Sequence, residues 1–80
     1  MSKSLTFSKA YRISWAIREI TINGYLEREE YEDMMFVGRR TSTRDFAELK
    51  TIFEMIYEFD FYYSRTKNRY EAKELWNLKH

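Results

Sequence analysis

The sequence predicts a mainly α-helical fold, a compact bundle of three or four helices. Apolar residues recur at helical spacing in several stretches, and the chain has no proline and only two glycines, Gly24 and Gly38, to interrupt them. Eighty residues are enough for one domain, so we expect residues 1–80 to form a single helical domain. A short β-hairpin at residues 3–7 or 36–41, or an extended N-terminal arm, is the alternative.

The first helix is expected to begin after Ser8, a suitable N-cap, and to end near Asn23, with Gly24 in the left-handed cap position. One face carries Ala10, Ile13, Ala16, Ile17 and Ile20. A second side carries Tyr11, Trp15 and Ile22. We therefore expect one side to meet the central helix and the other to meet the C-terminal segment or another molecule. A basic amphipathic helix lying on a membrane is a weaker alternative, because its basic face is thin.

The pattern predicts a short peripheral helix over residues 26–36 and a long central helix over residues 42–63. Ser42, with Asp45 three residues later, resembles a capping box at the start of the central helix. Its core-facing arc consists of Phe46, Leu49, Ile52, Phe53, Ile56, Phe59 and Tyr63. Phe61 and Tyr62 fall outside this arc, so they require a second neighbour.

After Tyr63 the apolar stripe fails, which indicates a break within residues 64–68; a bent continuation of one long helix is the alternative. A last helix is expected beyond it, supported by Tyr70, Ala72, Leu75, Trp76 and Leu78. Short connections between such helices favour antiparallel neighbours.

The charge balance excludes two classes of protein. A net charge of +1 argues against both a DNA mimic and a strongly basic nucleic-acid coater. The chain has no cysteine and no apolar run of the roughly 20 residues that span a membrane, so we expect a soluble cytoplasmic protein that does not enter membranes.

No signature of catalysis is present. The only histidine is the final residue, His80, and the two glycines are too far apart for a phosphate-binding loop. The paired carboxylates Glu29 with Asp33, and Glu54 with Glu58, are better explained as solvated helix surface. We therefore expect a non-enzyme without a cofactor or metal site.

The sequence favours a protein that binds another macromolecule. Six Phe, seven Tyr and two Trp exceed what a core of this size needs, and such rings are enriched at the centres of interfaces. The function first expected is inhibition or modulation by occlusion of a protein or protein–nucleic acid complex, as when phages or mobile elements block host defence such as CRISPR, or host transcription. A homodimer is one alternative. The expected partner-binding residues are Tyr11, Trp15, Phe61, Tyr62, Tyr63 and Trp76.

Direct binding of DNA or RNA is another alternative. It would use two basic clusters, and it requires that their six cations meet on one face: Arg39, Arg40, Arg44, Arg65, Lys67 and Arg69. A helix-turn-helix needs a small residue about four before its turn glycine and an apolar one about six after it. Gly38 is preceded by Met34 and followed by Arg44 at those positions, and Gly24 fails in the same way with Ile20 and Glu30. No motif is specific enough to indicate a family.

Overall fold

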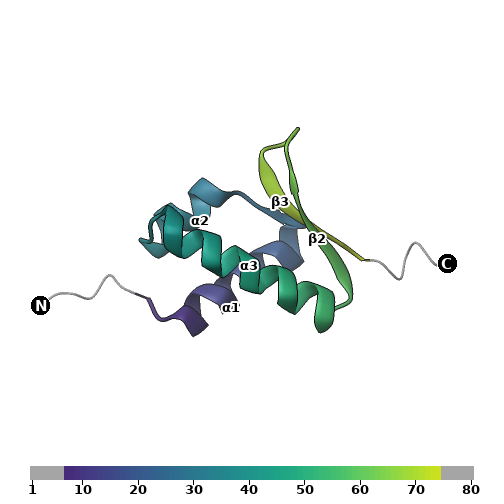
Figure 1. Cartoon of the computed structure of the whole chain (residues 1–80), viewed down its shortest axis with the longest axis horizontal. Helices are drawn as coiled ribbons and strands as arrows, with labels where there is room; N and C mark the ends of the chain where they lie inside the picture. The colour runs from purple at the N-terminus through teal and green to yellow at the C-terminus, as the bar shows by residue number, and fades with distance from the viewer. Residues whose placement is uncertain (1–6, 75–80) are drawn as a thin grey trace, which may run out of the picture.

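The structure is a computed structural model that describes residues 7–74. In chain order its elements are α1 (Lys9–Asn23), β1 (Tyr25–Leu26), α2 (Arg28–Met35), α3 (Arg39–Met55), β2 (Phe59–Ser64) and β3 (Arg69–Glu74) (Figure 1). The strands form one antiparallel sheet in the order β1-β3-β2. Three helices are confirmed within residues 9–55, but residues 25–26 form a strand and the segment after α3 is a β-hairpin, so the predicted bundle of three or four helices is not confirmed.

Both predicted ends of the first helix are confirmed. The Ser8 hydroxyl accepts a hydrogen bond from the Tyr11 backbone N–H at 3.1 Å. At the other end, Gly24 has φ +87° and donates its N–H to the carbonyl of Ile20 at 2.7 Å. Glycine fits here because a side chain disfavours this left-handed conformation. The buried residues of the helix are Ile13, Ala16 and Ile20.

The central helix ends at Met55, so the prediction that it continues to Tyr63 was wrong. The aromatic residues that follow alternate across a strand, and aromatic side chains are well suited to strands. Phe61, which a helix would leave outside the core, is 2% exposed and stacks on Phe53 at a ring distance of 5.5 Å. The expected last helix is likewise absent over residues 69–74, which form β3. Leu75, Trp76 and Leu78 lie outside the described residues.

The start of the central helix also differs from the prediction. It begins at Arg39 with Gly38 as N-cap, so Ser42 and Asp45 are not a capping box. Both are instead buried within the helix, at 0% and 1% exposure. The alternative hairpin at residues 36–41 is not formed, and of the alternative at 3–7 only Phe7 is among the described residues.

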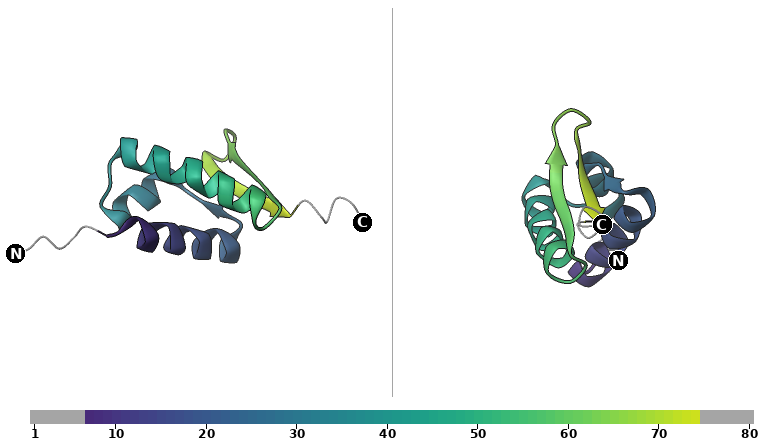
Figure 2. Two further views of the ribbon diagram at one scale, coloured as in Figure 1. Left: turned by 60° about the horizontal axis from the view of Figure 1, so that its bottom comes forward. Right: turned by 90° about the vertical axis from the view of Figure 1, so that its right-hand side faces the viewer.

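Stacked aromatic rings form much of the core and join the helices to the hairpin. Phe46 of α3 contacts Tyr31 of α2 at a ring distance of 5.1 Å and Tyr70 of β3 at 4.1 Å. Tyr31 is fully buried, so α2 belongs to the core and is not peripheral. The tip of the hairpin extends beyond the helices (Figure 2). Within residues 7–74, no helix combines the length and the apolar character needed to cross a membrane.

Candidate nucleic-acid interface

The helices α2 and α3 follow one another across a short turn, as the two helices of a helix-turn-helix do. Three residues, 36–38, connect them, and such motifs have turns of three or four residues that often contain glycine. Phe36 takes the left-handed conformation that ends α2, with φ +57°. Gly38, which the sequence test treated as the turn glycine, is the N-cap of α3. The spacing rule also fails when it is counted from Phe36, because Glu32 is not small and Ser42 is not apolar.

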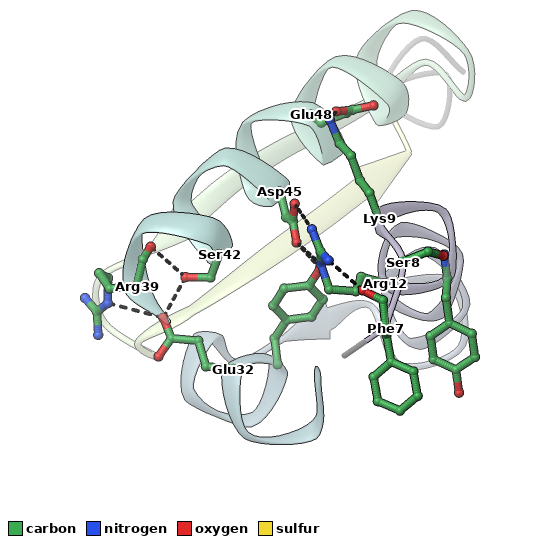
Figure 3. A network of polar contacts seen from close by, with 11 residues as sticks. Phe7, Ser8, Lys9, Arg12, Glu32, Arg39, Ser42, Asp45 and Glu48 are labelled. Atoms are coloured by element: carbon green, nitrogen blue, oxygen red, sulfur yellow. Dashed lines mark hydrogen bonds and ion pairs between the residues drawn. The ribbon is translucent and has the colours of Figure 1, made fainter. Parts of the chain in front are cut away.

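A polar cluster replaces the apolar contact that usually joins the two helices of this motif. Counting from Phe36, the residue four before is Glu32 and the residue six after is Ser42. The Ser42 hydroxyl donates to the Glu32 carboxylate at 2.6 Å (Figure 3). Arg28 and Arg39 add ion pairs to the same carboxylate at 3.1 and 3.3 Å. The hydrogen bond from Ser42, with help from both arginines, lowers the pKa of Glu32.

A buried ion pair fixes α3 against the other two helices. Arg12 of α1 donates to the Asp45 carboxylate at 2.7 and 3.3 Å, and the Tyr31 hydroxyl of α2 donates to it at 2.6 Å (Figure 3). Burial opposes ionisation of Asp45, but the hydrogen bonds from Arg12 and Tyr31 outweigh it and hold the pKa of the carboxyl below its usual value. The same burial, together with Asp45, raises the pKa of Tyr31. These contacts decide which side of α3 faces solvent.

The opposite side of α3, which we call the outer face, is exposed and basic. Its members are Arg40, Thr43, Arg44, Ala47, Lys50 and Thr51. The carboxylates of the helix are engaged elsewhere or neutralised: Asp45 is buried, Glu48 pairs with Lys9 of α1 at 2.5 Å, and Glu54 pairs with Lys50 at 2.7 Å. Arg40 and Arg44 make no ion pair with the described residues.

The structure does not bring all six predicted cations to one face: Arg40 and Arg44 lie on the outer face of α3, Arg65 and Lys67 lie at the hairpin tip, and Arg39 pairs with Glu32. Arg39 and Lys67 line the same hollow of about 190 Å³, which Glu27 and Glu29 also line. Arg65 is exposed at the tip and makes no ion pair within residues 7–74. Arg69 is held on the sheet, where it pairs with Glu71 at 2.8 Å and lies over the Tyr25 ring at 3.8 Å.

A larger hollow of about 330 Å³ lies on the surface where α3 meets the hairpin. Thr43, Ala47 and Lys50 line it from the outer face. The remaining lining residues are aromatic, namely Phe46, Phe61, Tyr62, Tyr63 and Tyr70. The hairpin flank of the outer face is therefore apolar next to α3 and basic at the tip.

The aromatic residues expected to bind a partner are scattered. Tyr11 and Tyr63 are exposed, at 49% and 42%. Trp15 packs against the core, and Tyr62 is half-buried with its hydroxyl donating to Glu71 at 2.8 Å. Phe61 is a core residue, and Trp76 lies outside the described residues. The five of them that the structure describes do not make one continuous surface.

Comparison with known proteins gives no assignment: no protein-family model, no curated protein and no solved structure matches this chain. In the part of the chain that the structure describes, acidic, histidine and cysteine side chains form no group that could hold a metal ion. The outer face of α3, with its unpaired Arg40 and Arg44, is the candidate functional site within residues 7–74.

Proposed function

We propose that the protein binds double-stranded DNA by placing the outer face of α3 in the major groove. The observation that carries this proposal is the segregation of charge on α3: its acids are buried or paired, whereas Arg40 and Arg44 point outward without an ion-pair partner among residues 7–74. In a helix-turn-helix the second helix is the one that enters the groove, and α3 holds that position.

The side chains of the outer face suit the major groove of B-DNA. That groove is about 12 Å wide and admits an α-helix. Thr43, Ala47 and Thr51 are small, so they allow close approach, and their methyl groups can contact thymine methyls. Arg40 can donate two hydrogen bonds to a guanine edge. The major groove of A-form RNA is too deep and narrow for a helix, so this geometry favours duplex DNA over duplex RNA.

The tip of the hairpin supplies contacts to the DNA backbone. Arg65 and Lys67 are both exposed there, on the same side of the molecule as the N-terminal end of α3, since Lys67 and Arg39 line one hollow. Contacts to phosphates set the position of a protein on the duplex without reading its sequence. Arg39 pairs with Glu32 at 3.3 Å and Lys67 pairs with Glu71 at 4.0 Å, so Arg65 is the cation of this region that is most available to a phosphate.

Fluorescence anisotropy with a labelled mixed-sequence 20-base-pair DNA duplex at about 50 mM salt tests this proposal. We expect tighter binding to DNA than to the RNA duplex of the same sequence. Arg40→Ala should weaken DNA binding roughly tenfold. The matched control is Arg18→Ala, which removes an exposed arginine on α1 and should leave binding unchanged. The absence of DNA binding by the unmodified protein, or equal losses in both variants, would overturn the proposal.

Protein binding is the second candidate function, and one observation favours it. Met55, Ile56 and Tyr57 follow one another at the end of α3 and are 76%, 70% and 45% exposed. Consecutive large apolar side chains in solvent are typical of a contact surface. A protein that acts by occlusion would use this end, and a homodimer would use it too. Light scattering tests for a homodimer, and a pull-down tests for a protein partner; each is repeated with Ile56→Glu. If the unmodified protein forms no dimer and captures no partner that Ile56→Glu loses, protein binding through this surface is rejected.

A further inference from the structure

A third hollow lies on the other flank of α3, away from the hairpin. It has a volume of about 250 Å³ and opens between the N-terminal turns of α1 and α3. Its lining residues are Lys9, Arg12, Thr41, Arg44 and Asp45. Three cations and one carboxylate therefore line this hollow, and one hydroxyl group accompanies them.

The charges of this hollow are not balanced within the protein. Asp45 neutralises Arg12, whose guanidinium also donates to the Phe7 carbonyl at 2.9 Å. Lys9 pairs with Glu48, but their side chains are 58% and 42% exposed, and exposed pairs of this kind are weak and easily exchanged. Arg44 makes no ion pair with the described residues. The hollow thus keeps one free guanidinium next to an exchangeable ammonium group.

Helical spacing places this hollow at one edge of the outer face. Thr41, Arg44 and Glu48 lie on the edge next to α1, as the pairing of Glu48 with Lys9 shows. Thr43 and Lys50 lie on the opposite edge, where they line the hollow next to the hairpin. A helix seated in the major groove has one DNA strand along each of its edges, so each strand meets a different basic site.

We propose that the hollow formed by Lys9, Thr41 and Arg44 binds a backbone phosphate of the DNA strand opposite to the one contacted by the hairpin tip. This inference rests on the proposed function. Arginine donates paired hydrogen bonds to phosphate oxygens, and Thr41 and Lys9 offer further donors. Two contacts on opposite strands fix the tilt and register of α3, which leaves Arg40 and its neighbours to contact the bases. Arg44 is therefore a positioning residue.

The salt dependence of DNA binding by the full chain tests the charge of the contact. Arg44→Gln should reduce the slope of log K against log salt concentration by about 0.9, with a similar loss of affinity for duplexes of different sequence. The matched control is Lys73→Gln, which removes an exposed cation of β3 that has no ion pair among residues 7–74 and should leave the slope unchanged. An unchanged slope for Arg44→Gln, or a change in sequence preference, would overturn the inference.

Ethylation interference tests the strand assignment, with a duplex selected from a random library. For the unmodified protein we expect interfering phosphates on both strands across one major groove. Arg44→Gln should remove the interference on one strand, and Arg65→Gln should remove it on the other. If both variants affect the same strand, the inference is wrong. If the unmodified protein does not bind DNA in either experiment, the proposed function fails first, so the two failures are distinguishable.

Discussion

Polar side chains on the two faces of α3 differ in burial and in whether they have a partner within the protein. On the inner face, Ser42 and Asp45 are fully buried and each has a partner from another helix. Among the described residues, no buried side-chain nitrogen or oxygen lacks a hydrogen-bond partner. On the outer face, Arg40 and Arg44 extend into solvent without an ion pair. The inner polar groups therefore orient the helix, and the outer ones are available to a ligand.

This contrast separates stability from binding within a single helix. Substitution on the inner face should lower the free energy of unfolding, because a buried ion pair that loses one partner leaves an uncompensated charge. Substitution on the outer face should change DNA affinity and leave the free energy of unfolding nearly constant, because exposed positions contribute little to it.

The largest effect is expected from Asp45→Asn. The substitution leaves the partly buried Arg12 guanidinium without its carboxylate, and it should reduce the free energy of unfolding by about 3 kcal/mol. Urea denaturation followed by circular dichroism measures this. The control is Asp60→Asn on the exposed side of β2, expected within about 0.5 kcal/mol of the unmodified protein. Similar stabilities for the two variants would contradict the assignment of Asp45 as an anchor.

A negative charge on the outer face should prevent binding without affecting folding. Ala47→Glu places a carboxylate in the middle of this face, where like-charge repulsion from phosphates should weaken DNA binding by at least roughly tenfold. Thr21→Glu introduces the same charge at an exposed position of α1 and serves as the control. Fluorescence anisotropy measures the DNA affinity of both variants, and thermal unfolding shows whether both remain folded. Equal affinities would place the DNA contact elsewhere.

A smaller loss of stability is expected from Ser42→Ala. The variant removes the 2.6 Å hydrogen bond to Glu32 but leaves the ion pairs of Glu32 with Arg28 and Arg39. The free energy of unfolding should fall by about 1 kcal/mol. Ser14→Ala, at an exposed position of α1, is the comparison and should cause no measurable change. A loss of unfolding free energy as large as that of Asp45→Asn would contradict this prediction, because it would show that the Ser42–Glu32 contact stabilises the fold as much as the Asp45 ion pair does.

The smallest effect is a pH dependence. The Tyr62 hydroxyl and Arg69 lower the pKa of Glu71, and a group whose pKa is lower in the folded state stabilises the fold above its unfolded pKa. That contribution is lost as the pH falls from about 4.3 towards the folded pKa. In Glu71→Gln the free energy of unfolding should therefore decrease less steeply below about pH 4 than in the unmodified protein. Urea denaturation at several pH values measures this. A curve parallel to that of the unmodified protein would contradict the lowered pKa of Glu71.

The sequence predicts the first helix well because its signals are local. Ser8, Gly24 and the apolar positions between them depend only on the chain nearby, and the structure confirms both caps and the burial of Ile13, Ala16 and Ile20, whereas Ala10 is exposed. The hairpin is different. Phe59 and Tyr63 fit a helical arc as well as a strand, and only the burial of Phe61 against Phe53 decides between the two. That contact joins residues from two elements, so no local pattern contains it.

The helix pair α2–α3 does not satisfy the spacing rule of a helix-turn-helix, and the structure gives a chemical reason. The spacing rule describes an apolar contact between two helices, and here a serine and a glutamate make that contact. The turn glycine is replaced by Phe36, a residue type that rarely adopts positive φ. Both basic clusters were visible in the sequence. That most of these cations lie on α3 and the hairpin tip depends on the fold, which also buries Asp45 and pairs Glu48 with Lys9.

Chemical-shift mapping of the ¹⁵N-labelled protein during titration with a 20-base-pair DNA duplex tests the central claim most directly. The largest changes are expected for the amides of residues 40–51 and 65–68, and the acidic residues of α2 (Glu29, Glu30 and Asp33) should be unaffected. The spectrum should remain that of the folded protein throughout. An unchanged spectrum, or changes concentrated at Met55, Ile56 and Tyr57, would show that the outer face of α3 is not a DNA-binding surface.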